Sequence, residues 1–261
     1  MNKRSENSVR VEHDRNIAIV TINRPQARNA VDSATAHLLA EAFQEFDRDD
    51  ALAVAILTGA QGTFCAGADL REVAAGTRPP VTADQHAPMG PTWMLLSKPV
   101  LAAVEGHAVA GGLELALWCD LRIAARNAVF GVFCRRWGVP LIDMGTVRLP
   151  RLIGQSHALD LILTGRGVSG DEALRMGLAN RLVEPGKALE SALELAHSLA
   201  AFPQNCLRTD RLSAHEQWSM TLDQARRNEL RGGLAVLESG ESQGGAARFS
   251  AGAGRHGSFD Q

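Results

Sequence analysis

The sequence predicts an α/β fold, because short strands rich in β-branched residues alternate with amphipathic helices. Residues 17–22 and 54–58 have the composition and alternation of strands. The helix predicted between them has apolar side chains at helical spacing, at Leu38, Leu39, Ala42, Phe43 and Phe46. Either Asp32 or Ser33 is suited to cap this helix. A strand, a helix and a second strand in this order favour parallel pairing of the strands.

The same alternation continues along the chain. Residues 100–104 form a short apolar run that is predicted to be a strand, and residues 121–125 form another. A glycine pair and an apolar helical stretch, residues 111–118, lie between them. Residues 74–92 interrupt the pattern, because they are rich in proline, glycine and threonine. We expect them to form a mobile insertion of the kind that covers binding sites.

Beyond Pro150 the pattern is mainly helical. Residues 169–172, Ser-Gly-Asp-Glu, fit a capping box at the start of a helix. A later apolar stripe consists of Leu189, Ala192, Leu193, Ala196 and Leu199. Residues 239–257 are rich in Gly, Ala and Ser and are predicted to form a poorly ordered tail. We therefore expect an α/β core at residues 1–200 and a C-terminal helical region at residues 201–261.

The composition excludes several classes of protein. The chain has 261 residues with 27 basic and 29 acidic side chains, and it is 45% hydrophobic, as globular rather than disordered chains are. A net charge of −2 gives no basic field for nucleic acid, and no apolar run reaches the roughly 18 residues of a membrane span. The N-terminal residues lack the apolar stretch of a secretory signal, which favours a cytoplasmic location. The four cysteines are far apart, so we expect free thiols and no metal site.

Two glycine-containing segments are candidates for a functional site. Residues 59–70 follow a predicted strand directly, and their small side chains let a ligand approach the main chain closely. An equally good interpretation of this segment is a strand-to-helix turn in which Asp69 caps the helix. In residues 107–114 a glycine pair opens an apolar helix, which leaves free amides at the positive end of the helix.

Glu114 lies one helical turn after Gly111, so its carboxylate can share a face with those amides. An acid in so apolar a segment is unusual. The alternative interpretation is a salt bridge between this glutamate and a nearby arginine, and a dinucleotide-binding loop is discounted because no GxGxxG is present. Together the two segments suggest an oxyanion hole, in which backbone amides of different loops bind one oxygen beside a carboxylate.

An ordered set of motifs gives this chain a family resemblance. Asn23-Arg24-Pro25 with Asn29-Ala30, Cys65-Ala66-Gly67-Ala68-Asp69-Leu70, residues 106–114 and Cys119-Asp120 together resemble the crotonase superfamily, the enoyl-CoA hydratase/isomerase family. The resemblance implies a spiral of ββα units and C-terminal helices that mediate trimerisation. It also implies that two trimers often stack into a hexamer.

The resemblance also implies roles for particular residues. The amides of Ala68 and Gly111 would hold the oxygen of an acyl-CoA thioester, and Glu114 matches the first catalytic glutamate of the hydratases. The residues implied to line the coenzyme A channel are Ala66, Asp69, Leu70 and Arg71, with Arg24 and Ala27 near its nucleotide end. Glu114 would deprotonate water or abstract an α-proton on the way to an enolate. Coenzyme A would enter as part of the substrate, and no other cofactor is implied.

The chain departs from the family pattern at the second catalytic glutamate. Cys134 occupies that position, either as a small apolar packing residue or as a thiol whose pKa is lowered by Arg135 and Arg136. Asp143 is the most plausible replacement, because its segment is similar to the Asp-x-Gly-Thr of dienoyl-CoA isomerases. The alternative role for Asp143 is to cap the following helix.

These observations favour an enoyl-CoA hydratase that acts on an acyl-CoA thioester and assembles as a homotrimer or a dimer of trimers. One alternative is an enoyl- or dienoyl-CoA double-bond isomerase that uses Glu114 and Asp143. The other is a non-catalytic acyl-CoA-binding subunit. Arg148 and Arg151 are predicted to form a solvated or subunit-facing charge cluster.

Overall fold

The computed structural model describes residues 8–82 and 86–254 of the chain, which divides into two compact units, Met1–His197 and Ser198–Gln261. The first unit combines two β-sheets with helices, and the described part of the second consists of helices. The α/β fold predicted from the sequence is therefore confirmed. The division between the units lies inside helix α7, Ala188–Ala201, whereas the sequence placed a boundary after residue 200.

Within the described residues, the larger sheet has six strands, in the order β1-β2-β3-β4-β6-β9. Their bounds are β1 Val9–Asp14, β2 Ile17–Ile22, β3 Val54–Gly59, β4 Val100–Val104, β6 Leu121–Ala125 and β9 Arg181–Val183. Strand β1 pairs with β2 in antiparallel fashion, and all other neighbours in this sheet are parallel. Strands β3 and β4 are almost entirely buried, as expected for parallel strands that are covered on both faces.

A smaller sheet carries the segment on which the glycine pair lies. Its strands are β5 His107–Val109, β7 Val129–Gly131 and β8 Gly167–Ser169, with β5 parallel to β7 and β7 antiparallel to β8. Strand β5 ends immediately before helix α3, Gly111–Trp118, and every residue of this helix is buried. Its complete burial explains why the segment is apolar on all sides.

Side-chain caps begin three of the remaining helices of the first unit, α1, α2 and α6. Helix α1, Ser33–Arg48, follows Asp32, whose carboxylate accepts a hydrogen bond from Thr35 N at 2.9 Å, so Asp32 and not Ser33 is the cap. Ser169 caps α6, but the predicted capping box is incomplete because the Glu172 carboxylate binds Arg166 at 2.7 Å. The other elements are 3₁₀ turns η1 Pro25–Ala27, η2 Ala60–Gly62 and η3 Phe133–Trp137 and helices α2 Leu70–Ala74, α4 Gly145–Ile153, α5 Gln155–Thr164 and α6 Gly170–Arg175.

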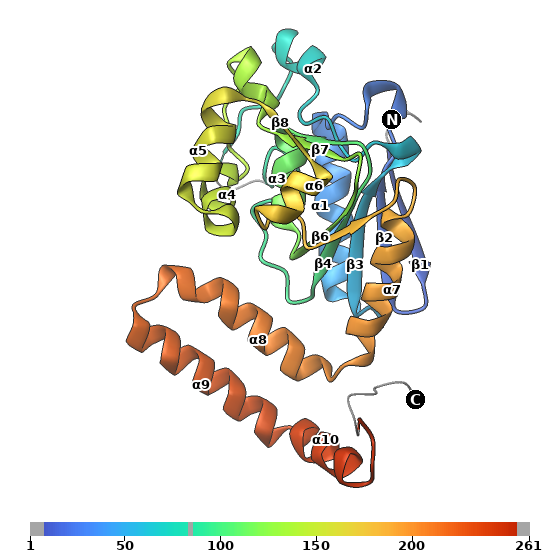
Figure 1. Cartoon of the computed structure of the whole chain (residues 1–261), viewed down its shortest axis with the longest axis vertical. Coiled ribbons are helices and arrows are strands. Elements are labelled where there is room, and N and C mark those ends of the chain that lie inside the picture. Colours follow the sequence, from blue (N-terminus) through green and yellow to red (C-terminus); the bar gives the residue numbers. More distant parts are fainter. Residues whose placement is uncertain (1–7, 83–85, 255–261) are drawn as a thin grey trace. The chain divides into compact units, whose positions relative to one another are not determined.

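The second unit is a helical hairpin followed by a further helix (Figure 1, orange to red). Helices α8 Gln204–Glu216 and α9 Leu222–Glu238 are joined through the 3₁₀ turn Gln217–Ser219, and α10 spans Glu241–Ser250. The prediction of a poorly ordered tail over residues 239–257 is wrong for the part that forms α10. The Glu241 carboxylate accepts hydrogen bonds from Asn205 N and Cys206 N, at 3.1 and 2.8 Å, and this tertiary contact compensates for the low helix propensity of the glycine-rich sequence. Residues 255–257 lie outside the described residues.

None of the helices in the described part of the chain combines the length and apolarity needed to cross a bilayer.

A buried arginine joins α3, β6 and the turn before β9. Arg122 is 1% exposed, and its guanidinium donates to the carbonyls of Leu178 and Cys119, at 2.7 and 2.8 Å. It also donates to Asn180 Oδ1 at 3.0 Å. These bonds satisfy several buried oxygens at once, which is the condition under which a buried charge is tolerated.

We expect Arg122→Met to lower the free energy of unfolding by about 3 kcal/mol or more, because it leaves buried carbonyl oxygens without donors. Denaturant unfolding followed by circular dichroism measures this change. Arg10→Met, at an exposed position of β1, is the matched control and should change stability by less than about 0.5 kcal/mol. Equal loss of stability in the two variants would contradict the role given to Arg122.

Candidate active site

The two glycine-containing segments predicted from the sequence lie side by side. Cys65 N donates to His107 O at 2.8 Å, and Val109 N donates to Cys65 O at 3.1 Å. The approach is so close that a Cβ built on Gly112 would be 2.1 Å from Cys65 O. Gly67 has a φ of +96°, and a Cβ there would be 2.9 Å from Gly111 N. Only glycine therefore fits at both positions, and the loop of Gly67 lies directly against the start of α3.

The backbone amides of Ala68 and Gly111 remain available to a ligand. Within the part of the chain that the structure describes, neither N–H has a hydrogen-bond acceptor. Ala110, with φ 54° and ψ −126°, adopts a conformation that L residues rarely occupy, and it turns the chain from β5 into α3. Gly111 consequently presents its N–H at the positive end of a helix. Both residues line the same cavity.

That cavity has a volume of about 440 Å³. Apolar side chains form much of its wall, and two carboxyl groups, those of Glu114 and Asp143, lie among them. Other lining residues include Ala66, Ala68, Leu70, Met89, Phe133, Cys134, Trp137, Val139 and Ile142. An apolar pocket with a few convergent polar groups is the usual architecture of a small-molecule site.

Glu114 is held by the loop that precedes α4. The side chain is 2% exposed, and its Oε1 accepts hydrogen bonds from Asp143 N at 2.9 Å and Gly145 N at 2.8 Å. A Cβ on Gly145 would lie 2.7 Å from this oxygen, so the loop packs directly against the carboxyl group. No salt bridge joins Glu114 to an arginine among the described residues, and the structural alternative considered for this residue is therefore wrong.

Asp143 is held by the segment between α2 and β4. It is 3% exposed, and its Oδ1 accepts hydrogen bonds from Met89 N at 2.9 Å and from the Thr92 hydroxyl. The alternative role as a helix cap is wrong, because Met144 is the N-cap of α4 and no side chain caps that helix. Met89 and Thr92, in the proline-rich insertion, thus contact the site directly. The predicted mobility of residues 74–92 stays a prediction.

Burial shifts the pKa of both carboxyl groups. Burial and the neighbouring charge of Asp143 raise the pKa of Glu114 to about 8. Burial also raises the pKa of Asp143, but donors from Thr92 and Met89 oppose this shift. Because the Asp143 charge contributes to the raised pKa of Glu114, Asp143 loses its proton first and Glu114 second. Near neutral pH Glu114 is therefore mainly protonated.

Cys134 lines the cavity without the properties of a reactive thiol. It is 6% exposed, and burial together with the Glu114 charge raises its pKa. The alternative in which Arg135 and Arg136 lower this pKa is wrong, because the burial of the thiol has the larger effect. The thiol packs as a small apolar group.

Arg148 is a site residue that the sequence analysis missed. Its guanidinium donates to Asp143 O at 3.1 Å and to Thr92 O at 2.7 Å, and burial lowers its pKa. The prediction of a solvated or subunit-facing cluster is wrong for this residue. The residues next to Arg148 in the sequence give no indication that its side chain points into the interior.

The residues implied for the coenzyme A channel fall into two groups. Ala66 and Leu70 line the cavity, as does Arg28, which the sequence analysis did not single out. Ala27 lies in η1 and is not among the lining residues. The expected channel roles of all these residues remain predictions.

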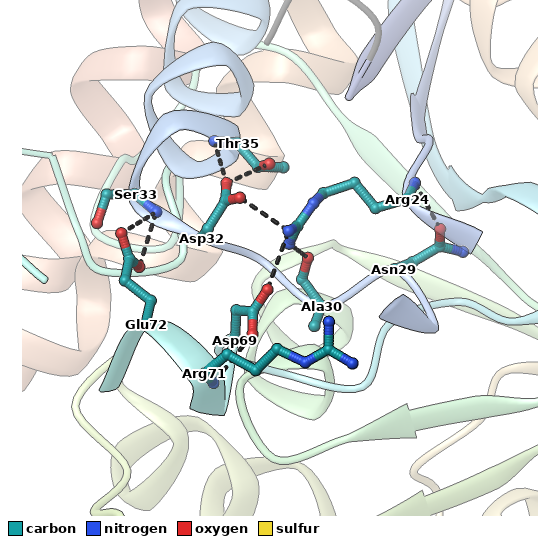
Figure 2. A network of polar contacts seen from close by, with 9 residues as sticks. All are labelled: Arg24, Asn29, Ala30, Asp32, Ser33, Thr35, Asp69, Arg71 and Glu72. Carbon is teal, nitrogen blue, oxygen red and sulfur yellow. Dashed lines mark hydrogen bonds and ion pairs between the residues drawn. The ribbon is translucent and has the colours of Figure 1, made fainter. Parts of the chain in front are cut away.

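Arg24 and Asp69 form an ion pair instead of lining the cavity. Figure 2 shows the Arg24 guanidinium between Asp32 and Asp69, with N–O distances of 2.8 and 2.9 Å. Asp69 also caps α2 by accepting a hydrogen bond from Arg71 N at 3.1 Å, so the structural interpretation of this aspartate is confirmed. The Arg71 guanidinium is drawn in Figure 2 without a bond to this network. The network fixes α1, α2 and the Ala68 segment relative to one another.

No group of three or more His, Cys, Asp or Glu side chains suited to a metal ion occurs within residues 8–82 and 86–254.

Comparison with known proteins places this geometry in a family. A crystal structure of enoyl-CoA hydratase from Mycobacterium tuberculosis superposes with a TM-score of 0.89 at 38% identity, covering 94% of this chain and 96% of the other. The enoyl-CoA hydratase EchA19 of the same species is 36% identical over 92% of both chains. A short-chain-enoyl-CoA hydratase of Clostridium acetobutylicum is 39% identical over 75% of this chain and 76% of its own.

The chain thus has the crotonase fold, which is the fold class that the sequence resemblance implied. The model of the family described as enoyl-CoA hydratase/isomerase matches residues 12–251. The chain belongs to the enoyl-CoA hydratase/isomerase family.

The raised pKa of Glu114 makes the stability of the folded protein depend on pH. A folded pKa of about 8, above the ordinary 4.5, means that folding favours the protonated acid, so this stabilisation is complete below pH 4.5 and is lost as the pH rises through about 8. We expect the free energy of unfolding to fall over this window by at most about 1.4 kcal/mol per pH unit from this group. Denaturant titrations at several pH values measure the slope.

Glu114→Gln keeps an acceptor oxygen but cannot ionise, so its slope over the same window should be flatter than that of the unmodified protein. The same slope in both proteins would contradict the raised pKa.

Proposed function

We propose that the protein is an enoyl-CoA hydratase, which adds water across the 2,3-double bond of an enoyl-CoA thioester. The observation that carries this proposal is the pair of unbonded amides, Ala68 N–H and Gly111 N–H, in the same cavity as two buried carboxyl groups. Two fixed donors stabilise an oxygen that becomes negatively charged during a reaction. Family membership supports the proposal that this oxygen is that of an acyl thioester.

The chemistry follows from the polarised thioester. Hydrogen bonds to its oxygen make the β-carbon electrophilic and stabilise the enolate that forms when a nucleophile adds. The hydroxyl of water then joins the β-carbon and a proton joins the α-carbon, which restores the carbonyl group. One carboxylate must accept a proton from water, and one carboxylic acid must supply a proton to the α-carbon.

The two carboxyl groups supply these functions in place of a pair of glutamates. Glu114, whose pKa is raised to about 8, is the proton donor near neutral pH, and Asp143, which loses its proton before Glu114, is the acceptor. From the sequence, Glu114 is expected to deprotonate water or to abstract an α-proton. As proposed here, it donates the proton to the α-carbon in hydration and abstracts it in the reverse direction, dehydration. Cys134 contributes only to the shape of the pocket.

A double-bond isomerase is the second candidate, and one observation favours it. The second acidic group is not at position 134 but in the loop 143–146, whose sequence is similar to that of dienoyl-CoA isomerases. A proton taken from one carbon by Asp143 and returned to another from Glu114 would shift a double bond without adding water.

The assembly is proposed to be a trimer or a dimer of trimers, as the family resemblance implies. The second unit carries large apolar side chains at exposed positions of its own surface, and burying them against another subunit would be favourable. These side chains are Trp218, Leu222, Leu230, Leu234 and Leu237.

The reaction is tested by following the absorbance of the conjugated thioester. Crotonyl-CoA should lose this absorbance if the protein is a hydratase, and a 3-enoyl-CoA should gain it if the protein is an isomerase. Binding of the CoA ester by calorimetry with neither change would support the non-catalytic alternative and overturn the proposal. Longer 2-enoyl-CoA chains, assayed in parallel, define the preferred acyl length.

We expect Glu114→Gln and Asp143→Asn to lower kcat by similar factors of about 100 or more, because each removes one half of the acid–base pair. Steady-state kinetics with crotonyl-CoA measure both values. Asn and Gln preserve side-chain size and acceptor oxygens, and circular dichroism checks the fold. Near-normal turnover by Asp143→Asn would exclude this residue from the mechanism.

A further inference from the structure

A β-turn over the cavity carries a peptide group that lies between two charged side chains. Gly90 N donates to Ala87 O at 2.8 Å, which closes a turn with Pro88 in its second position. The hydrogen bond of a β-turn uses its outer residues, so the central peptide, Pro88 C=O with Met89 N–H, is left to bond outward.

Both ends of this central peptide are bonded to charged groups. The Arg78 guanidinium donates to Pro88 O at 2.7 Å, and Met89 N donates to Asp143 Oδ1 at 2.9 Å. A cation at the carbonyl and an anion at the N–H polarise a peptide in the same direction, so each hydrogen bond strengthens the other. The turn therefore links Arg78 to the carboxylate through one peptide group.

The placement of Arg78 supports a specific function. Its neighbours in residues 74–82 are exposed, whereas Arg78 is half-buried and lines the cavity together with Pro88. An arginine that turns inward from an otherwise solvated segment must gain interactions there, since burial of its charge is unfavourable. The hydrogen bond to the Pro88 carbonyl uses one of the N–H donors of the Arg78 guanidinium.

We propose that Arg78 is a positioning residue, which holds the Pro88–Met89 peptide with its N–H directed at Asp143 and so keeps that carboxylate fixed and ionised. The inference rests on the proposed function for its catalytic consequence only. The geometric claim, that Arg78 controls the state of Asp143 through a peptide, can be tested separately from turnover.

The charged and titratable groups around Asp143 come from four elements. Glu114 of α3, Cys134 of η3 and Arg78 line the cavity together with Asp143. Arg148 of α4 does not line the cavity, but its charge also acts on Asp143. Burial raises the pKa of Asp143, while Thr92, Met89, Arg78 and Arg148 act in the opposite direction. Removing the positive charge of Arg78 should therefore raise this pKa further.

The test is a direct titration of Asp143 by carbon NMR. Protein labelled at the aspartate side-chain carboxyl carbon is titrated, and the Asp143 resonance is identified by its absence in Asp143→Asn. Arg78→Gln keeps a donor without the charge, Arg78→Met removes both, and Arg78→Lys keeps both. We expect the first two variants to raise the midpoint by roughly 0.5–1 pH unit, and the lysine variant to leave it nearly unchanged.

An unmoved midpoint in Arg78→Gln and Arg78→Met overturns the proposal. An equal rise in Arg78→Lys overturns it too, because packing and not charge would then be responsible. Arg10→Met, which removes an exposed arginine of β1, controls for the change in net charge and should leave the resonance unshifted.

Kinetics with crotonyl-CoA separate this inference from the proposed function. If Arg78 positions Asp143, Arg78→Met lowers kcat by about 10-fold or more, KM changes little, and the lysine variant restores most of the loss. A rise in KM alone, with an unshifted NMR midpoint, would instead mean that Arg78 contacts the substrate. If the unmodified protein does not hydrate crotonyl-CoA but the midpoint shifts as expected, the positioning role stands and the hydratase assignment fails.

Discussion

The geometry of the site depends on Glu114 Oε1, which accepts hydrogen bonds from two backbone N–H groups. These donors belong to Asp143 and Gly145, so a side chain from the middle of a buried helix determines where the following loop lies. The loop in turn places the second carboxyl group in the same cavity. Burial raises the pKa of both carboxyl groups, and the charge of Asp143 raises that of Glu114 further, so Asp143 loses its proton first. The proposed acid–base pair is thus a consequence of how two segments pack.

The sequence predicted the fold well where the signal is local. The strands at residues 17–22, 54–58, 100–104 and 121–125 all exist, since each is a short segment dominated by apolar residues. The strands of the smaller sheet have only three residues each, too few for any periodicity to indicate them. Helix α10 was missed because Glu241 bonds to the start of α8, a contact between residues far apart in the sequence that propensity does not report.

The site was predictable in its backbone but not in its side-chain partners. The glycines of residues 65–70 and 107–114 indicated a close approach of main chain, which the structure contains. The partners of Asp143 were not predictable, since Met89, Thr92 and Arg148 come from segments with no shared motif. For Asp69, local sequence could not decide between a cap and a channel residue, and its ion pair with Arg24 depends on tertiary packing.

The centre of the cavity and its entrance differ in the kind of residue that surrounds them. The amides of Ala68 and Gly111 and the two buried carboxyl groups are surrounded by glycines that admit no side chain, at positions 67, 112 and 145. The mouth of the cavity, by contrast, carries Leu70, Trp137 and Ile142, which are 43%, 69% and 45% exposed and have room for replacement. Substitutions can therefore change the shape of the entrance while the amides and carboxyl groups keep their positions, so the scaffold can accommodate differently shaped ligands without any change at the centre of the cavity.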